Sequence, residues 1–435
     1  MIPEIELKSR EEIKAFQEEK LRELLGYLSE KSPYYSEMFK ENNIDIRSIK
    51  KLEDLTKIPV TTKDDLQKRT KDFICIAKNK IVDYNTTSGT LGDPVTFVLS
   101  DKDLDRLAYN EFISLSCSNG TPDDIYQMMV TIDRRFMAGI AYYLGLRRMG
   151  AGIVRVGPGN AQLQFDTMVR INPTALIAVP SFLIKLIEYA ERNGIDINST
   201  SVKKAVCIGE PIRNSDFSLN TLGKRIKAKW DIEIYSTYAS TEMGTAFNEC
   251  EYGVGGHHHP ELIIVEFLDD NNEPVADNEP GEVVITTLGV EAMPLLRFKT
   301  GDICYHFKEP CKCGRTTLRI GPVLGRKQQM IKYKGTTLYP SIIYDILNEI
   351  DFIENYFIEV STGALGTDEL LIKVGGKSGI KNAEKQIKDR FRAKMRVAPE
   401  IEIISPAEIK KLQMIDVNRK PRIFADKRGL NSYDG

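Results

Sequence analysis

The sequence predicts an α/β protein with a large N-terminal domain and a small C-terminal α+β domain. Strand-like and helix-like segments alternate between residues 138 and 235, which is typical of βαβ units in a parallel sheet. From residue 262 to 302 strand-like runs follow one another directly, which predicts an antiparallel, barrel-like subdomain. Beyond Gly325-Arg326 the composition becomes more basic and the pattern restarts. We therefore expect two domains, residues 1–326 and 327–435.

Length and composition indicate a globular protein with a small-molecule partner. The chain has 435 residues, too many for one ordinary core, and is 42% hydrophobic and 28% charged. Its 60 basic and 62 acidic residues give a net charge of -2, which leaves no electrostatic footprint for nucleic acid or a membrane surface. We see no signal peptide and no apolar run long enough to span a membrane, so we expect a cytoplasmic protein.

The individual elements follow from periodicity. Apolar residues at near-helical spacing predict a helix over residues 11–32, and a strand over 95–99 precedes a helix over 101–116. In the middle of the chain we expect helices over 138–149, 161–171, 181–193 and 216–228, and strands over 152–156, 175–179, 205–208 and 231–235. In the C-terminal domain we expect strands over 356–361, 369–374 and 401–404, and a helix over 381–395.

A run of hydroxyl residues and glycines precedes the strand over 95–99. It reads Thr86-Thr87-Ser88-Gly89-Thr90-Leu91-Gly92-Asp93-Pro94. Glycine lets backbone N–H groups turn toward an anion, and Ser and Thr hydroxyls donate further hydrogen bonds to it. The run has neither Walker spacing nor dinucleotide-loop spacing. By itself it predicts either a phosphate-binding loop or a polar turn between strands.

Further segments carry chemically informative residues in a fixed order. They are Ile234 to Met243, Leu296 to Asp302, Leu324 to Gly335, and Lys420 near the C-terminus. With Tyr34-Tyr35, Ile58 to Leu66, Gly209-Glu210-Pro211 and Leu338-Tyr339-Pro340, these segments cover nearly the whole chain. In these motifs the sequence resembles the phenylacetate–coenzyme A ligase group of the adenylate-forming superfamily.

The resemblance implies an enzyme that adenylates a carboxylic acid with ATP and Mg²⁺, releases pyrophosphate, and transfers the acyl group to coenzyme A. It also implies that the small C-terminal domain is mobile and rotates about a hinge, here at Gln328. We expect an aromatic acid of the phenylacetate or benzoate kind. Transfer to a carrier protein or an amine, and an inactive zinc-stabilised binding protein on the same fold, are the alternatives. A homodimer is an open possibility.

The resemblance also assigns roles to single residues. Lys420 would bridge the substrate carboxylate and the α-phosphate, and Glu242 would hold Mg²⁺. Asp302 would accept the ribose hydroxyls, and Arg326 would reach ribose or phosphate. The pyrophosphate would be held by Thr86, Thr87, Ser88, Gly89, Thr90 and Gly92. The other expected nucleotide-binding residues are Gly209, Glu210, Pro211, Tyr238, Ala239, Ser240 and Thr241.

The pocket for the acid is expected from two segments. Its walls would come from a mixed aromatic and polar set of residues, namely Phe136, Met137, Ala138, Tyr235, Ser236 and Tyr238. Three residues depart from the pattern of the group, namely Asp93 beside the hydroxyl loop, Ala239 after Tyr238, and Gln328 at the hinge. None of these departures removes a required role.

Three cysteines and a histidine predict a structural zinc site. Cys250, His257, Cys311 and Cys313 supply four ligands, the number that a closed tetrahedral zinc site uses. The Cys-x-Cys spacing is tighter than the usual Cys-x₂-Cys, so reduced thiols are the alternative. Some relatives in the resembling group have a Cys, a His and a later Cys-x-Cys-Gly-Arg, which Cys313-Gly314-Arg315 matches. His258 and His259 are possible substitutes for His257.

Overall fold

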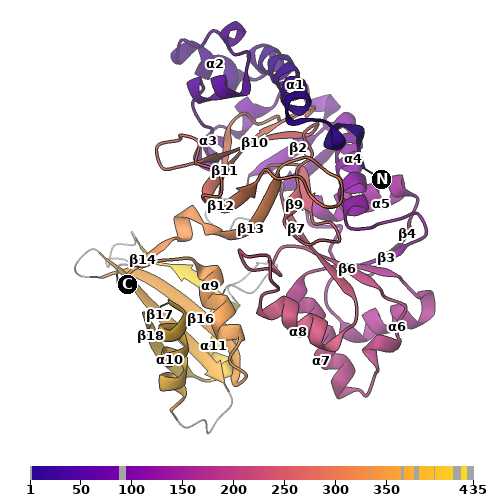
Figure 1. The fold of residues 1–435 in the computed structure, drawn as a ribbon, viewed down its shortest axis with the longest axis vertical. Helices are drawn as coiled ribbons and strands as arrows, with labels where there is room; N and C mark the ends of the chain where they lie inside the picture. Colours follow the sequence, from indigo (N-terminus) through magenta and orange to yellow (C-terminus); the bar gives the residue numbers. More distant parts are fainter. Residues whose placement is uncertain are drawn as a thin grey trace. The chain divides into compact units, whose positions relative to one another are not determined.

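The computed structural model describes residues 2–87, 95–334, 336–363, 367–376, 382–395, 397–414 and 423–428 (Figure 1). They form two compact units, residues 1–323 and 324–435. The boundary falls inside strand β13 (Arg319–Arg326), slightly before the position expected from composition.

The large unit begins with helices that cover part of its core. Helix α1 (Arg10–Lys31) starts with a capping box between Ser9 and Glu12, and α2 (Pro33–Glu41) starts with proline at its first position. The apolar face of α1 buries leucines such as Leu21 and Leu28, which confirms the predicted N-terminal helix. A short helix, α3 (Lys63–Lys68), precedes the hairpin of β1 (Asp83–Thr86) and β2 (Thr96–Leu99).

A six-stranded sheet forms the middle of the large unit, in the order β4-β3-β5-β6-β7-β8. Neighbouring strands from β4 to β7 are parallel, and β8 is antiparallel to β7. The strand order reverses between β3 and β5, and ligands bind at such a point beyond the carboxyl ends of the strands. The strands are β3 (Ile125–Met128), β4 (Gly152–Arg155), β5 (Ala175–Ala178), β6 (Lys204–Cys207), β7 (Glu233–Ser240) and β8 (Thr245–Asn248).

Helices cover both faces of this sheet. Successive side chains of a strand point to opposite faces, so Ala175 and Ile177 of β5 pack against α4 and α5. Leu176 and Ala178 instead pack against α6, α7 and α8. The helices are α4 (Asp101–Cys117), α5 (Met137–Met149), α6 (Ala161–Ile171), α7 (Pro180–Arg192) and α8 (Thr221–Lys229). This arrangement confirms the predicted βαβ layers.

Two details of this region differ from the prediction. The sheet contains β3, which the periodicity did not reveal because its buried Gln127 interrupts the apolar run. That amide donates to the side chain of Gln164 on α6 at 2.6 Å. Helix α8 begins at Thr221 and not at residue 216, because Asn220 caps it by accepting a hydrogen bond from the N–H of Gly223.

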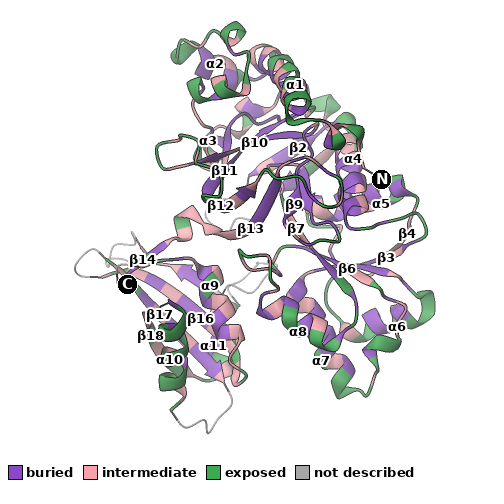
Figure 2. Cartoon of the chain, viewed as in Figure 1, coloured by how far each residue is buried: buried purple, intermediate pink, exposed green. Residues whose placement is uncertain are grey.

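The predicted antiparallel subdomain is a five-stranded sheet. Its order is β10-β11-β12-β13-β9, and its strands alternate in direction from β10 to β12. All 7 residues of β11 are buried, and the strand is coloured accordingly in Figure 2. The remaining strands are β9 (Gly256–His257), β10 (Ile263–Leu268), β11 (Gly281–Thr287) and β12 (Phe298–Phe307).

The small unit is an α+β module with its own core. Its four-stranded sheet has the order β18-β17-β16-β19, and β14 (Ile331–Tyr333) pairs with β15 (Thr336–Leu338). Phe391 and Ile387 of α10 pack on this sheet, as their helical spacing predicted. The elements are α9 (Pro340–Asn348), β16 (Ile353–Thr362), β17 (Asp368–Gly376), α10 (Ala383–Met395), β18 (Glu400–Ile404), α11 (Pro406–Gln413) and β19 (Phe424–Asp426).

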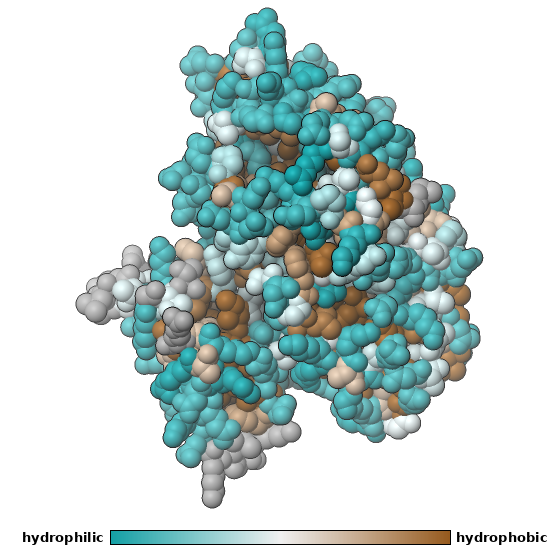
Figure 3. Space-filling model, in the orientation of Figure 1, coloured by the Kyte–Doolittle hydropathy of each residue, from teal (hydrophilic) through white to brown (hydrophobic). Residues whose placement is uncertain are grey.

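The face of the molecule in Figure 3 is mainly hydrophilic, with smaller apolar areas between the polar side chains. Among the described residues, no helix is both long enough and apolar enough to cross a membrane.

Candidate functional site

A hydrogen bond joins the six-stranded sheet to the five-stranded sheet at two predicted site residues. The hydroxyl of Tyr238 on β7 donates to Oδ2 of Asp302 on β12 at 2.9 Å. Burial, together with the nearby charge of Asp302, raises the pKa of Tyr238 well above its usual value, so the phenol stays protonated and acts as the donor. The structure therefore brings together the residues expected beside adenine and ribose.

The backbone of β12 aims Asp302 at this position through a bulge. Glu282 pairs with Ile303 and Val284 with Lys299, so the three residues 300–302 lie opposite the single residue Val283. Within the bulge Gly301 has φ of 78°, a left-handed conformation that glycine adopts without strain. Bulges are common beside active sites because they redirect a side chain.

The turn between β7 and β8 carries Glu242. Ser240 pairs with Thr245, and the Ser240 hydroxyl accepts a hydrogen bond from the N–H of Met243. Glu242 is therefore presented at the tip of a hairpin that continues the strand of Tyr238. Ala239 and Thr241 lie on the same hairpin, Ala239 opposite Ala246.

Arg106 of α4 holds this hairpin, and the sequence analysis did not single it out. Its guanidinium donates to the carbonyl oxygens of Gly244 at 2.7 Å, Leu262 at 2.6 Å and Leu288 at 2.7 Å. It also donates to Oγ1 of Thr245 at 3.2 Å. Burial lowers the pKa of Arg106 to about 10, so it remains charged at neutral pH.

The base of the hydroxyl loop is ordered by two threonines. The N–H of Thr86 donates to the carbonyl oxygen of Arg135, which places the end of β1 beside the segment before α5. The N–H of Thr87 donates to Val95, and the Thr87 hydroxyl accepts from the N–H of Val95 at 3.0 Å. The predicted phosphate contacts Ser88, Gly89, Thr90 and Gly92, and the departing Asp93, lie outside the described residues.

The Gly209-Glu210-Pro211 element follows β6 at the same carboxyl edge. Gly209 has φ of 73° and turns the chain there. The Glu210 carboxylate accepts hydrogen bonds from the N–H of Ser181 at 2.9 Å and from its hydroxyl at 3.0 Å. Ser181 lies in the first turn of α7, so the Glu210 carboxylate accepts its hydrogen bonds at a helix N-terminus, where negative charge is favourable. Glu210 thus fixes the position of the element beside the sheet.

The expected pocket residues are not all on one side of β7. Tyr235 and Tyr238 are an odd number of residues apart, and the Tyr235 hydroxyl accepts from Asn119 at 3.2 Å, away from Asp302. The N–H of Ser236 donates to Glu249 at 3.1 Å. Of the other segment, Phe136 and Ala138 pack with the core under α5, whereas Met137 lines a cavity of about 30 Å³ together with Glu242 and Arg106.

The early Tyr34 to Leu66 segment supports β12. The Tyr35 hydroxyl accepts a hydrogen bond from the N–H of Leu296, and the Thr61 hydroxyl donates to the carbonyl oxygen of Leu296. The N–H of Thr61 also donates to Arg297, and that of Lys299 donates to Thr61. These contacts hold the strand that carries Asp302, so part of the motif has a structural role.

Arg326 and Gln328 belong to the small unit, and Lys420 lies outside the described residues. Arg428 donates to the carbonyl oxygens of Gln328 at 2.9 Å and Met330 at 2.7 Å. The segment of the predicted hinge is therefore tied to the C-terminal end of its own unit.

The four predicted zinc ligands come together. The ligand atoms of Cys250, His257, Cys311 and Cys313 all lie within 4.8 Å of one another. The Sγ atoms of Cys250 and Cys311 are 3.6 Å apart, and Sγ of Cys313 is 3.5 Å from Nε2 of His257. A tetrahedral zinc ion with Zn–S bonds of about 2.3 Å separates its ligand atoms by roughly 3.5 to 3.8 Å. The donor set and its dimensions therefore fit a zinc ion.

The adjoining histidines are engaged elsewhere. Nε2 of His258 bonds to the carbonyl oxygen of Ile263, and Nδ1 of His259 bonds to Glu6. His257 is the member of the run that faces the cysteines, as expected. Hydrogen bonds from Cys250 and His257 hold the pKa of the Cys313 thiol below its usual value.

Comparisons with known proteins agree with this architecture. The family model for AMP-binding enzymes matches residues 19–292, and the model for the AMP-binding enzyme C-terminal domain matches residues 335–428. A phenylacetate-coenzyme A ligase of Thermus thermophilus is 30% identical over 380 residues, which is 86% of this chain and 84% of the relative. One of Escherichia coli is 27% identical over 85% of this chain and 84% of its own length.

A solved relative has the same fold. The crystal structure of a 2-hydroxyisobutyryl-CoA ligase in the postadenylation state aligns with a TM-score of 0.85 at 22% identity. The alignment covers 98% of this chain and 91% of the other. Together with the family models and the curated relatives, it places both units in one known architecture. The chain belongs to the AMP-binding enzymes, within the group of phenylacetate-coenzyme A ligases.

Proposed function

We propose that the protein adenylates a carboxylic acid with ATP and then transfers the acyl group to coenzyme A. The observation that carries the proposal is the junction of Tyr238, Asp302 and the Glu242 hairpin in a chain of this family. In the first step the carboxylate attacks the α-phosphorus of ATP and pyrophosphate leaves. In the second step the thiol attacks the acyl carbon and AMP leaves.

Each step needs charge stabilisation more than a covalent enzyme intermediate. Asp302, oriented by Tyr238, would accept the ribose hydroxyls, and Gly209 to Pro211 would border the base. Glu242 would hold Mg²⁺, which neutralises developing phosphate charge when it is bound with ATP. The hydroxyl loop, anchored by Thr87, would hold the pyrophosphate.

The small unit would supply Lys420 to the adenylation step and rotate away before thioester formation. This role rests on the family resemblance. A lysine suits it because a point charge on a flexible stem can be brought in and withdrawn. Replacing Lys420 by alanine should lower adenylation at least a hundredfold while leaving the thermal unfolding temperature unchanged.

Isotope exchange tests the proposal. Labelled pyrophosphate should exchange into ATP only when a suitable acid is present, and a panel of aryl and alkyl acids, starting with phenylacetate, identifies that acid. Addition of coenzyme A should then yield an acyl thioester that is detectable by mass spectrometry. If no acid in the panel supports exchange, the enzyme is not an adenylating one.

For the acyl acceptor, a specific observation favours an alternative to coenzyme A, namely an amine. A relative named indoleacetate–lysine synthetase is 26% identical over 57% of this chain, and an amine accepts the acyl group in the reaction its name describes. We favour coenzyme A because two relatives at 30% and 27% identity, which align over 84% of their own length, are phenylacetate-coenzyme A ligases. Exchange without thioester, followed by an amide product with added amines, would reverse this choice.

We further propose that the Cys/His cluster binds one structural zinc ion. All four positions of a tetrahedral site would be filled by protein ligands, so the ion would fasten the end of β8 to β9 and to the β12–β13 connection. Elemental analysis of protein purified without chelator should give one zinc per chain. A content below a tenth of an equivalent would exclude the site.

A further inference from the structure

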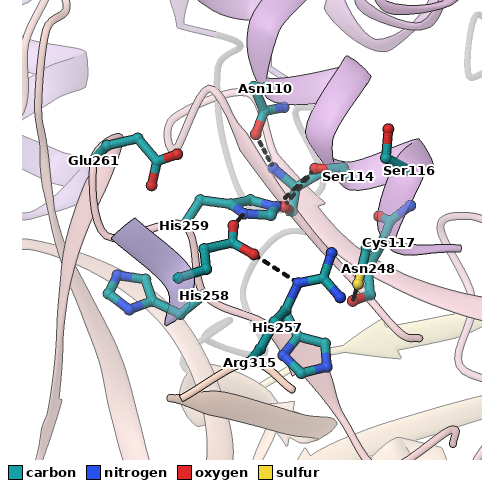
Figure 4. Close-up of polar contacts among 12 residues, drawn as sticks. Asn110, Ser114, Ser116, Cys117, Asn248, His257, His258, His259, Glu261 and Arg315 are labelled. Atoms are coloured by element: carbon teal, nitrogen blue, oxygen red, sulfur yellow. Dashed lines mark hydrogen bonds and ion pairs between the residues drawn. The ribbon is translucent and has the colours of Figure 1, made fainter. Parts of the chain in front are cut away.

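A buried ion-pair network adjoins the Cys/His cluster, and Figure 4 shows two of its members, Arg315 and His259, near His257. Nε of Arg315 donates to Oε2 of Glu6 at 2.6 Å, and Oε1 of Glu6 lies 2.5 Å from Nδ1 of His259. Nε2 of His259 is 3.0 Å from Oγ of Ser114. Burial by itself raises the pKa of Glu6, but His259 and Arg315 outweigh that effect and hold the pKa below its usual value. Glu6 is therefore ionised at neutral pH.

The same arginine reaches the cluster. Nη1 of Arg315 donates to Sγ of Cys313 at 3.5 Å. The guanidinium therefore contacts the Glu6 carboxylate through Nε and a ligand sulfur through Nη1. Arg315 closes the turn that carries both cysteines, because its carbonyl oxygen accepts from the N–H of Cys311 at 2.9 Å. Glu6 comes from the first short helical segment of the chain, Glu4–Leu7.

The Ser114-His259-Glu6 arrangement has the order of a hydrolytic triad, but burial rules out that activity. All three residues are 0% exposed, so no substrate carbonyl can approach Oγ of Ser114. Ser114 also donates to the carbonyl oxygen of Ala246 at 3.1 Å, which anchors it to β8. The network is a framework rather than a reaction centre.

Stability alone is a poor reason for such a framework. Moving a carboxylate and a guanidinium out of water costs several kcal/mol for each ion, and apolar residues of the same volume are often as stable or more stable. The buried charges are better explained if the positive charge of Arg315 stabilises a neighbouring group. Three thiolates around a divalent ion carry excess negative charge, which a donating guanidinium offsets.

We propose that Arg315 and Glu6 stabilise the metal site without binding the ion themselves. Arg315 donates a hydrogen bond to the ligand sulfur of Cys313, and Glu6 holds the Arg315 guanidinium in position. The inference rests on the zinc proposal above but not on the adenylation chemistry. A residue that hydrogen-bonds to a metal-binding side chain orients that side chain, and its loss typically weakens metal binding 10–100-fold.

A second consequence is coupling between the metal and the start of the chain. The N–H and hydroxyl of Thr316 donate to the carbonyl oxygen of Glu6 at 2.9 and 3.0 Å, next to the Arg315 contact. Zinc binding and docking of residues 4–8 therefore favour each other. Linkage requires that the effect runs in both directions.

Zinc affinity of purified full-length variants tests the inference. Competition with a chromophoric chelator at pH 7.5 should show 10–100-fold weaker zinc binding for Glu6→Gln and Arg315→Lys. The matched control is Glu266→Gln, which breaks another buried ion pair, to Arg297 at 2.9 Å. Its zinc affinity should equal that of the wild type.

Amide hydrogen exchange of the wild type provides a test without mutation. Removal of zinc should speed exchange in residues 4–9, and adding zinc back should restore protection. Wild-type zinc affinity in both variants, or unchanged exchange after zinc removal, would overturn the inference. A wild-type protein that holds no zinc would overturn it together with the zinc proposal, whereas pyrophosphate exchange tests the adenylation independently.

Discussion

Replacing Arg106 by methionine removes the side chain that holds the Glu242 hairpin against two other segments. The methionine keeps the length of the side chain but donates no hydrogen bond. The carbonyl oxygens of Leu262 and Leu288 lose their guanidinium donor, and both residues are buried. The Thr245 hydroxyl loses a donor as well, but it can rotate toward another partner.

The cost can be worked from these contacts. The Leu262 carbonyl oxygen still accepts from the N–H of Leu288 at 2.8 Å. A buried acceptor left without a donor costs about 1–3 kcal/mol, and this cost applies to the Leu288 carbonyl oxygen. The adjoining cavity of about 30 Å³ admits a water molecule that relieves part of this cost. We expect the free energy of unfolding to fall by about 2 kcal/mol, which lowers Tm by about 4 °C in a unit of this size. A shift of the hairpin by 1 Å should slow adenylation about a hundredfold.

The assay is acid-dependent pyrophosphate exchange at 15 °C, well below Tm, with Tm measured by calorimetry. Ile226→Ala is the matched control, because Ile226 is fully buried on α8 away from the hairpin and its truncation costs about 2–5 kcal/mol. Arg106→Lys should recover part of the activity. If folded Arg106→Met exchanges pyrophosphate as fast as Ile226→Ala, Arg106 does not position Glu242.

Three further predictions concern separate features. Tyr238→Phe removes the hydrogen-bond donor to Asp302 and should raise the KM for ATP about tenfold, which is equivalent to about 1.4 kcal/mol. Steady-state exchange kinetics measure this KM, and an unchanged value would contradict the prediction. Gly325→Ala places a Cβ 2.3 Å from the ring of Tyr339 and should destabilise the small unit by about 1–3 kcal/mol, a loss that adding Tyr339→Ala should partly reverse. Burial raises the pKa of Glu111 to about 8, so the folded state binds a proton that the unfolded state releases, and stability should fall as pH rises from about 4.5 to 8. Glu111→Gln should flatten this dependence in urea unfolding, and equal slopes in both proteins would refute it.

Much of the fold could be predicted because the elements of a parallel sheet are encoded locally. The alternation of helix and strand over 138–235 reflects burial of each strand on both faces, as Leu176 and Ile177 show. Strand β3 escaped detection because Gln127 finds its partner on α6, a long-range contact that no local pattern reveals. Helix α11 was also missed, although Ser405 and Glu408 form a capping box that marks its start.

The candidate site divides in the same way. Motif order pointed to Tyr238, Asp302 and the four zinc ligands, and the structure brings each set together. The role of Arg106 could not be predicted from the sequence. An arginine on an amphipathic helix has no local pattern that indicates which four acceptors it will hydrogen-bond in the fold. The positions of Tyr235 and Tyr238 on opposite faces follow from strand geometry and could have been anticipated.

The most direct test of the central claim follows oxygen through the reaction. The acid that supports pyrophosphate exchange is supplied with both carboxylate oxygens as ¹⁸O, together with ATP and coenzyme A. Attack by the carboxylate on the α-phosphorus predicts that each AMP released carries one ¹⁸O and each thioester retains the other. Label in pyrophosphate or inorganic phosphate, or formation of ADP, would contradict adenylation by this protein.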